Sequence, residues 1–295
     1  MKRYSWVLVF LFLLVFSSGC VGGNGLNLSF FSLVPSGPFY TTVEDLSVKT
    51  EAVPHDVYSG KTTTLYFDVS NEGNITLSDL NVQITDPSLF TSEESLEKKI
   101  PELEPEETKS WEWELKADDV ALPKDCTIRY KTEYSSQALA LYDVSAITEE
   151  EFTRLQRSRR LENETNLFYY KTKSPVDIDI SLSKEQPILE DMEFYLYINL
   201  RDVGTGYVEK ISRGDMTLKY PNFLELESCD DLEKNNGVLT LRNDLNFINK
   251  QAKTITCKFK TKKDIGEIKT IGQFEVDIKY KYMYYDTINV RVNPK

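Results

Sequence analysis

The chain carries one strand-and-turn pattern twice. Residues 65–74 read LYFDVSNEGN, and residues 196–205 read LYINLRDVGT, 131 positions later. A fixed order of similar segments at nearly constant offset is typical of a duplicated domain whose loops differ in length. We therefore expect two copies of one unit of roughly 130 residues. Prolines on both sides of the pattern match at offsets of 133 and 134: Pro54 with Pro187, and Pro87 with Pro221.

Apolar side chains alternate with polar ones inside each copy. Leu65, Phe67 and Val69 are separated by Tyr, Asp and Ser, and this period of two is typical of a strand with one buried face. The alternation recurs at 111–115, 128–134 and 276–284, and turn residues separate these runs. The pattern predicts an all-β fold of two tandem immunoglobulin-like antiparallel β-sandwiches joined by a short helix and linker. We place the sandwiches at residues 45–147 and 175–295, and the helix and linker at 148–174.

The repeated turn resembles a known type of module. An apolar strand, then Asn-x-Gly, then a strand closing at Pro runs from Val69 to Pro87. This resembles the CARDB-like and related immunoglobulin-like modules of prokaryotic surface proteins. The second copy follows the pattern from Leu200 to Pro221, with Asp202 in the position of Asn71. The resemblance implies an immunoglobulin-like fold and residence at the cell surface, and it implies no catalytic or binding residue.

One helix is expected between the copies. Thr148 and Glu151 fit a capping box, and Phe152 and Leu155 follow on one face. The helix carries most of the basic residues of this region: Arg154, Arg157, Arg159 and Arg160. This basic cluster either docks an acidic partner or pairs with the glutamates one turn away.

The N-terminus predicts export. Lys2 and Arg3 precede an apolar run at 6–16 that is too short to span a membrane, so residues 1–19 read as a signal peptide. The following Gly19-Cys20 and the glycines after it resemble the lipobox of prokaryotic, and more closely archaeal, lipoproteins, although Ser17 stands where that family usually has Leu. The resemblance implies a lipid on Cys20, residues 20–44 as a flexible tether, and anchoring at the outer face of the cell membrane. The alternative is an ordinary secretory signal whose Cys20 later forms a disulfide.

Composition restricts the partners. The chain has 35 basic and 47 acidic residues, a formal net charge of −12, so nucleic acid is not an expected partner because its phosphates would be repelled. Three Asn-x-Ser/Thr triplets are candidate glycosylation positions in an exported chain: Asn27, Asn74 and Asn163.

The remaining cysteines suggest one disulfide. Cys229 and Cys257 lie in the same copy, and in an oxidising exterior they are the economical pair. Cys126 lies in a predicted strand, and we expect a buried free thiol there.

No motif of a catalyst is found. His55 is the single histidine, which excludes histidine clusters for metals and histidine-based triads within one chain. Glycine loops that cradle phosphates or dinucleotides are absent from the sequence. We expect no metal, no cofactor and no enzymatic activity.

The sequence favours a noncatalytic, lipid-anchored surface protein with a scaffold, adhesion or envelope-interaction role. Its expected partners are the membrane, through the lipid, and envelope or surface proteins. The alternative is a glycan- or solute-binding surface lipoprotein, with Tyr195, Tyr197 and Tyr207 around the turn of the second copy as a glycan platform. Packing of these rings against neighbouring elements would remove that alternative.

Overall fold

The computed structural model describes residues 44–158, 167–235 and 237–295. The predicted signal peptide, Cys20, Asn27 and Asn163 lie outside these ranges. Most of the described residues lie in strands, and they include one α-helix, α2 (Glu149–Arg157). The predicted all-β fold with immunoglobulin-like sandwiches is confirmed.

The first copy consists of two facing sheets. One has the strand order β1-β3-β7-β5, and in the other β6, β4 and β8 lie side by side. Leu65, Phe67 and Val69 of β3 are buried between the sheets together with Trp113, as their alternation predicts, whereas Trp111 is only partly buried. The strands are β1 (Leu46–Val53), β3 (Thr62–Asn71), β4 (Leu77–Asp86), β5 (Phe90–Thr91), β6 (Glu97–Leu103), β7 (Thr108–Ala117) and β8 (Lys124–Ile147).

The second copy repeats this order. Strands β10, β12, β20 and β15 follow one another as β1, β3, β7 and β5 do, and β17, β14 and β21 match β6, β4 and β8. The strands are β10 (Val176–Leu182), β12 (Glu193–Asp202), β14 (Met216–Lys219), β15 (Leu224–Cys229), β17 (Val238–Leu241), β20 (Ile255–Thr261) and β21 (Lys269–Asn293). Four short strands extend these sheets: β13 (Lys210–Ile211), β16 (Leu232–Asn235), β18 (Leu245–Ile248) and β19 (Gln251–Ala252).

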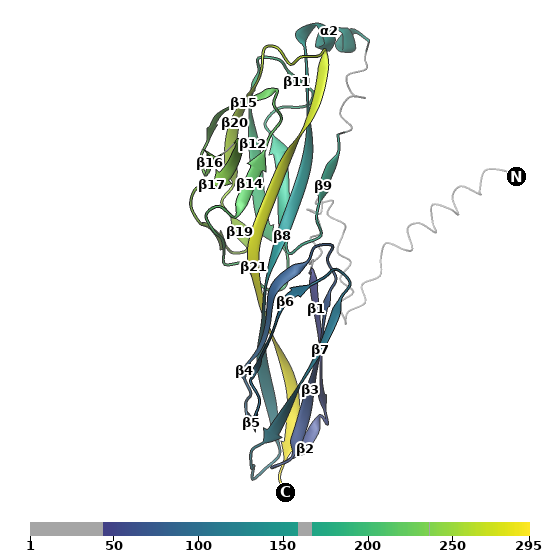
Figure 1. The fold of residues 1–295 in the computed structure, drawn as a ribbon, viewed down its shortest axis with the longest axis vertical. Coiled ribbons are helices and arrows are strands. Elements are labelled where there is room, and N and C mark those ends of the chain that lie inside the picture. The colour runs from purple at the N-terminus through teal and green to yellow at the C-terminus, as the bar shows by residue number, and fades with distance from the viewer. Residues whose placement is uncertain (1–43, 159–166, 236) are drawn as a thin grey trace, which may run out of the picture. The chain divides into compact units, whose positions relative to one another are not determined.

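The last strands of the two copies pair with each other along their entire length. β8 has 24 residues and β21 has 25, and they run antiparallel from the pair Lys124–Val292 to the pair Ile147–Lys269. Figure 1 shows both strands crossing from one copy into the other. At about 3.3 Å per residue they form a two-stranded ribbon about 80 Å long, called the ribbon below.

The end of each copy's last strand lies in a sheet of the other copy. β2 (Asp56–Tyr58) of the first copy pairs in parallel with the end of β21, and β11 (Ile188–Leu189) of the second copy pairs in parallel with the end of β8. These short strands follow the matched prolines, Pro54 and Pro187, and both prolines follow cis peptide bonds. Each sandwich therefore contains a strand segment supplied by the other copy.

This exchange differs from the expected division into two bodies and a linker. The end of β21, inside the expected second sandwich, lies in a sheet of the first copy. Residues expected in the linker form β9 (Tyr169–Lys171), which pairs with β8. The described residues belong to one compact unit. Alternation of side chains shows which face of a strand is buried, but it does not show which strand lies alongside.

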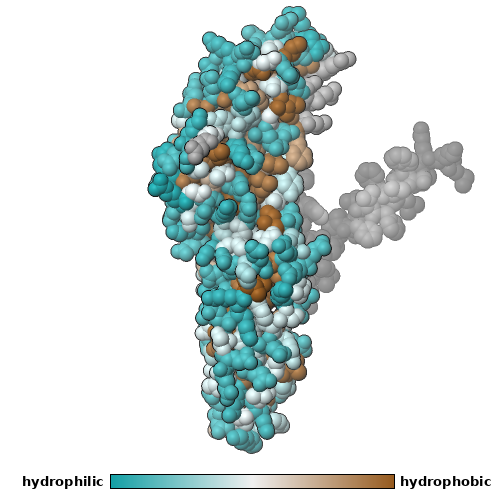
Figure 2. Space-filling view, in the orientation of Figure 1, coloured by the Kyte–Doolittle hydropathy of each residue, from teal (hydrophilic) through white to brown (hydrophobic). Residues whose placement is uncertain are grey.

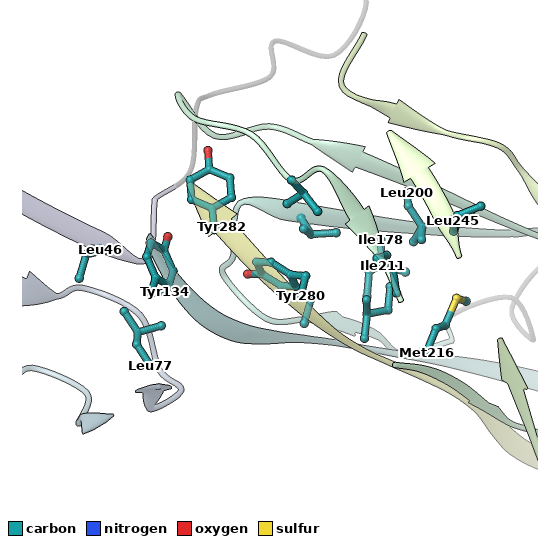
Figure 3. Packing of buried hydrophobic residues seen from close by; sticks show 14 of the residues in the cluster. Leu46, Leu77, Tyr134, Ile178, Leu200, Ile211, Met216, Leu245, Tyr280 and Tyr282 are labelled. Atoms are coloured by element: carbon teal, nitrogen blue, oxygen red, sulfur yellow. The ribbon is translucent and has the colours of Figure 1, made fainter. Parts of the chain in front are cut away.

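The buried side chains form a cluster that continues through the middle of the ribbon. Tyr134 of β8 and Tyr280 and Tyr282 of β21 fill the region where the ribbon passes between the copies, called the junction below (Figure 3). Leu46 and Leu77 of the first copy belong to the same cluster. Within the described residues, no helix is long and apolar enough to cross a membrane.

Candidate functional site

The repeated turn is a structural element in both copies. The backbone N–H of Gly73 donates to Asn71 Oδ1 at 2.9 Å, and that of Gly204 donates to Asp202 Oδ1 at 3.1 Å. Both side chains are buried. The turn residues therefore hold the chain and do not face a ligand.

The change from Asn to Asp fits the groups that each copy presents. Asn71 Nδ2 donates to the carbonyl oxygens of Ile75 and Leu103, both at 2.9 Å. In the second copy, Asp202 Oδ2 instead accepts from the backbone N–H of Val208 at 3.2 Å. An amide suits two acceptors, and a carboxylate suits a second donor.

A buried carboxylate lies at the junction. Asp45 accepts hydrogen bonds from the hydroxyls of Tyr134 and Ser136, the latter at 2.9 Å, and its Oδ2 lies 3.5 Å from the Tyr280 hydroxyl. Desolvation raises the pKa of Asp45 above its usual value, and the Tyr134 and Ser136 hydrogen bonds partly offset this effect. Burial also raises the pKa of Tyr134 and Tyr280. A cluster of hydroxyls around one shielded carboxylate is suited to fixing the junction rather than to contacting solvent.

The first two residues that the structure describes, Glu44 and Asp45, lie at the junction. The carbonyl oxygen of Asp45 accepts from the backbone N–H groups of Glu72 and Gly73 in the first copy. The Glu44 carboxylate accepts from the backbone N–H of Thr205 in the second copy and from its hydroxyl, the latter at 2.6 Å. Glu44, the last residue of the predicted tether, and Asp45, the residue after it, therefore contact the second and the first copy respectively.

A polar cleft of about 730 Å³ lies over the ribbon. Its floor is the outward face of the two strands, with Lys131, Glu133, Ser135 and Gln137 from β8 and Lys279, Lys281 and Met283 from β21. The first copy contributes Thr76 and Ser78, and the second contributes Glu209, Lys210, Ser212 and Asp215. Both copies therefore line one cleft.

Two exposed tyrosines lie beside this cleft. Tyr207 exchanges backbone hydrogen bonds of 2.8 and 3.1 Å with Met283, a residue of the cleft floor, and Tyr285 pairs in register with Lys131. Their rings are nearly parallel, with 12° between the planes and 6.3 Å between the centroids. A hydrogen bond to Tyr285, together with desolvation, raises the pKa of Tyr207 to about 12.

The predicted glycan platform is divided between two places. Tyr195 and Tyr197 stack on each other with centroids 6.3 Å apart, on the face of β12 opposite the buried Phe194 and Leu196. Tyr195 is 42% exposed. Tyr207 instead lies against Tyr285 of β21, in the other sheet. The rings are thus accessible, but the structure does not bring the three together.

Sequence reasoning missed Lys279, Lys281 and Tyr285. The alternation at 276–284 marks the buried face of that strand, whereas Lys279, Lys281 and Tyr285 lie on the opposite face. The alternation predicts that these residues are neighbours on one face of a strand. It does not predict which residues of the two copies line the cleft beside them.

The predicted disulfide is confirmed. Cys229 of β15 and Cys257 of β20 are joined, and Cys126 is a buried free cysteine, as expected.

Asn74 is exposed in the turn, where its Nδ2 donates to the Tyr170 hydroxyl at 3.3 Å, and its glycosylation stays a prediction.

Neither α2 nor His55 forms a site for a ligand or a metal among the described residues. Thr148 caps α2 by accepting from the backbone N–H of Glu151 at 3.3 Å, and the Glu151 carboxylate accepts from Arg154 at 2.6 and 2.7 Å. Arg159 and Arg160 lie outside the described residues. His55 is exposed, and across the described ranges no three His, Cys, Asp or Glu side chains are grouped as metal ligands would be. The pairing of Arg154 favours a solvated helix face over a docking site.

One family model matches the chain. Residues 43–139, about a third of the sequence, match the CARDB family. The matched range covers most of the first copy, so it supports the immunoglobulin-like assignment of that copy. No curated protein matches the sequence.

Several solved structures are similar to the chain at low identity. Escherichia coli alpha-2-macroglobulin activated by porcine elastase is 10% identical with a TM-score of 0.22, covering 86% of this chain and 22% of that one. The secreted serine protease VesC from Vibrio cholerae is 10% identical with a TM-score of 0.19, covering 82% and 50%. The Enterococcus faecalis MSCRAMM ACE, described as binding its ligands by the collagen hug model, is 11% identical with a TM-score of 0.17, covering 86% and 98%. The chain thus spans about a fifth of the length of the first of these proteins.

Proposed function

We propose that this protein is a noncatalytic surface lipoprotein that presents one stiff pair of sandwiches outside the cell for scaffolding, adhesion or envelope interaction. The observation that carries the proposal is the ribbon, because continuous backbone pairing of shared strands holds the two copies together. A stiff body is suited to holding a binding surface in a fixed orientation.

Several further observations support residence outside the cell. The Cys229–Cys257 disulfide is of a kind that persists in oxidising surroundings. The CARDB match and the signal-like N-terminus support export as well. A lipid on Cys20 would hold the chain at the membrane, and Glu44 and Asp45 would connect the tether to both copies.

The proposed partners follow from the charge and surface of the body. A net charge of −12 disfavours nucleic acid, and the proposal includes no cofactor. The face shown in Figure 2 is mainly hydrophilic, with its hydrophobic residues in small separate patches. Such a surface suits polar contacts with envelope proteins rather than one large apolar interface.

Lipid anchoring can be tested by expressing the full chain in a host that processes lipoproteins. We expect the mature protein to begin at Cys20, to carry the mass of a lipid there, and to remain with membranes after a high-salt wash. Cys20→Ala should release it into the soluble fraction or leave it unprocessed, whereas the control Cys126→Ala should stay with membranes. An unmodified Cys20 in a protein secreted freely would contradict the proposal.

A further inference from the structure

We propose that the cleft over the ribbon binds an anionic saccharide. Lys279 and Lys281 would bind its carboxylate or sulfate groups, and the Tyr207–Tyr285 pair would stack on a sugar ring. The inference rests on the proposed function only in assuming that the protein acts by binding another molecule. It adds the class of ligand, an anionic saccharide. It does not depend on the lipid.

The cleft floor is built by strict alternation. Tyr280 and Tyr282 point into the core, so Lys279, Lys281, Met283 and Tyr285 share the outward face of β21. Residues on one face of a strand are about 6.6 Å apart for each step of two, so Lys279 and Tyr285 are about 20 Å apart along the strand. The charged and the aromatic ends therefore belong to one continuous surface suited to an extended ligand.

Two cations in this cleft lack an anionic partner. Lys131 pairs with Glu133 at 2.8 Å, and Lys210 pairs with Asp244 at 2.6 Å. The exposed Lys279 and Lys281 form no ion pair with any residue that the structure describes. The two ammonium groups are neighbours on one face of β21, and an anionic group placed between them would make charge-assisted hydrogen bonds.

The other polar groups suit hydroxyl-rich ligands. Ser78 of β4, Ser135 of β8 and Ser212 of the segment after β13 line the cleft with hydroxyls, and the Glu209 and Asp215 carboxylates can accept hydrogen bonds from sugar hydroxyls. These carboxylates would disfavour a ligand charged along its whole length, such as nucleic acid. The site therefore suits a sugar chain with separated anionic groups.

The tyrosine pair supplies the apolar surface that a sugar needs. Tyr207 is 39% exposed and Tyr285 is 58% exposed, although both are large aromatic side chains. The backbone bonds of Tyr207 to Met283 fix the position of that residue, so little ordering is required on binding. Exposed aromatic rings next to convergent polar groups are typical of sites that bind amphipathic ligands.

The test is titration calorimetry of the full chain with three probes. These are an oligogalacturonate, which carries carboxylates, a heparin-derived oligosaccharide, which carries sulfates, and a neutral dextran oligosaccharide. We expect one or both anionic probes to bind and the neutral one to bind at least about tenfold more weakly. The probe that binds more tightly identifies which anionic group the cleft accepts.

Variants assign the binding to the cleft. Lys279→Gln with Lys281→Gln should weaken anionic binding at least about tenfold, and Tyr285→Ala about fivefold, with unchanged thermal unfolding because all three side chains are exposed. Lys49→Gln with Lys61→Gln removes the same charge from exposed lysines outside the cleft and should leave the affinity for the anionic probes unchanged. The inference is overturned if neither anionic probe binds at millimolar concentration, if the neutral probe binds equally well, or if the control pair loses as much affinity. Those results would leave the mass and membrane fraction of the lipoprotein unaffected.

Discussion

Tyr134 of β8 and Tyr282 of β21 are directly paired in the ribbon, with ring centroids 5.6 Å apart and both side chains fully buried. Each belongs to the last strand of its own copy, at the point where that strand passes into the other copy. The two sandwiches are therefore joined by backbone pairing of β8 with β21. We expect the stability of each sandwich to depend on the stability of the other.

The Cys229–Cys257 disulfide should stabilise the fold. It closes a loop with a sequence separation of 28 residues, and the chain-entropy model assigns roughly 3 to 4 kcal/mol to such a loop. Replacing both residues with Ala should lower the free energy of unfolding by about this amount, as measured by urea denaturation. Cys126→Ala should keep the wild-type sensitivity to reducing agent. A wild-type midpoint that reducing agent does not change would contradict the prediction.

Asp45 should make stability depend on pH. Burial raises the pKa of the folded carboxyl above 3.8, so between that value and the folded pKa the folded chain holds a proton that the unfolded chain has released. The contribution is thus present at the acidic end and is lost as pH rises through this window, at up to about 1.4 kcal/mol per pH unit.

The Asp45→Asn variant isolates this effect. The free energy of unfolding of the wild type, minus that of the variant, should fall as pH rises from about 4 and then become constant. The subtraction removes the contributions of other carboxyls, such as Asp202, whose pKa is also raised by desolvation. A difference that grows with pH would mean that the folded pKa of Asp45 is lowered.

The turn of the first copy should require an amide. Asn71→Asp replaces two donated hydrogen bonds with a carboxylate facing the carbonyl oxygens of Ile75 and Leu103. We expect a loss of about 2 to 4 kcal/mol in the free energy of unfolding. Asn74→Asp makes the same chemical change at an exposed neighbour and should cost less than about 0.5 kcal/mol. Equal effects of the two substitutions would show that the buried hydrogen bonds are not decisive.

The sequence predicts those features that depend on local pattern. Alternation at Leu65, Phe67 and Val69 identifies a buried strand face because side chains of a strand point to opposite sides in turn. The Cys229–Cys257 pair follows from the cysteine positions. The turn at Asn71 can be predicted because Asn and Gly, at positions 71 and 73, are residues that favour turns.

The exchange of strands depends on long-range pairing and could not be predicted in this way. Residues 128–134 and 276–284 show the same alternation whether they pair with each other or with a strand of their own copy. Tyr169–Lys171 read as linker because all three residues of β9 are exposed and only backbone pairing with β8 defines the strand. Tyr207 and Tyr285 form a pair because a bridge to Met283 places them together, and the spacing between them contains no such signal.

The matched residues Leu65 and Leu196 allow the coupling of the two copies to be measured. Both are fully buried at equivalent positions of β3 and β12, and truncation to Ala should cost about 2 to 5 kcal/mol. Without residues 1–19 the chain contains two tryptophans, Trp111 and Trp113, and both lie in β7 of the first copy. Tryptophan fluorescence of a chain without residues 1–19 therefore reports unfolding of the first copy.

The most direct measurement is the urea midpoint of this fluorescence in Leu196→Ala, a substitution confined to the second copy. We predict that the midpoint falls by about as much as in Leu65→Ala, because the ribbon makes the two sandwiches unfold together. A tryptophan midpoint that stays at the wild-type value in Leu196→Ala, while far-ultraviolet circular dichroism shows a separate earlier transition, would contradict the exchange of strands as the basis of the fold.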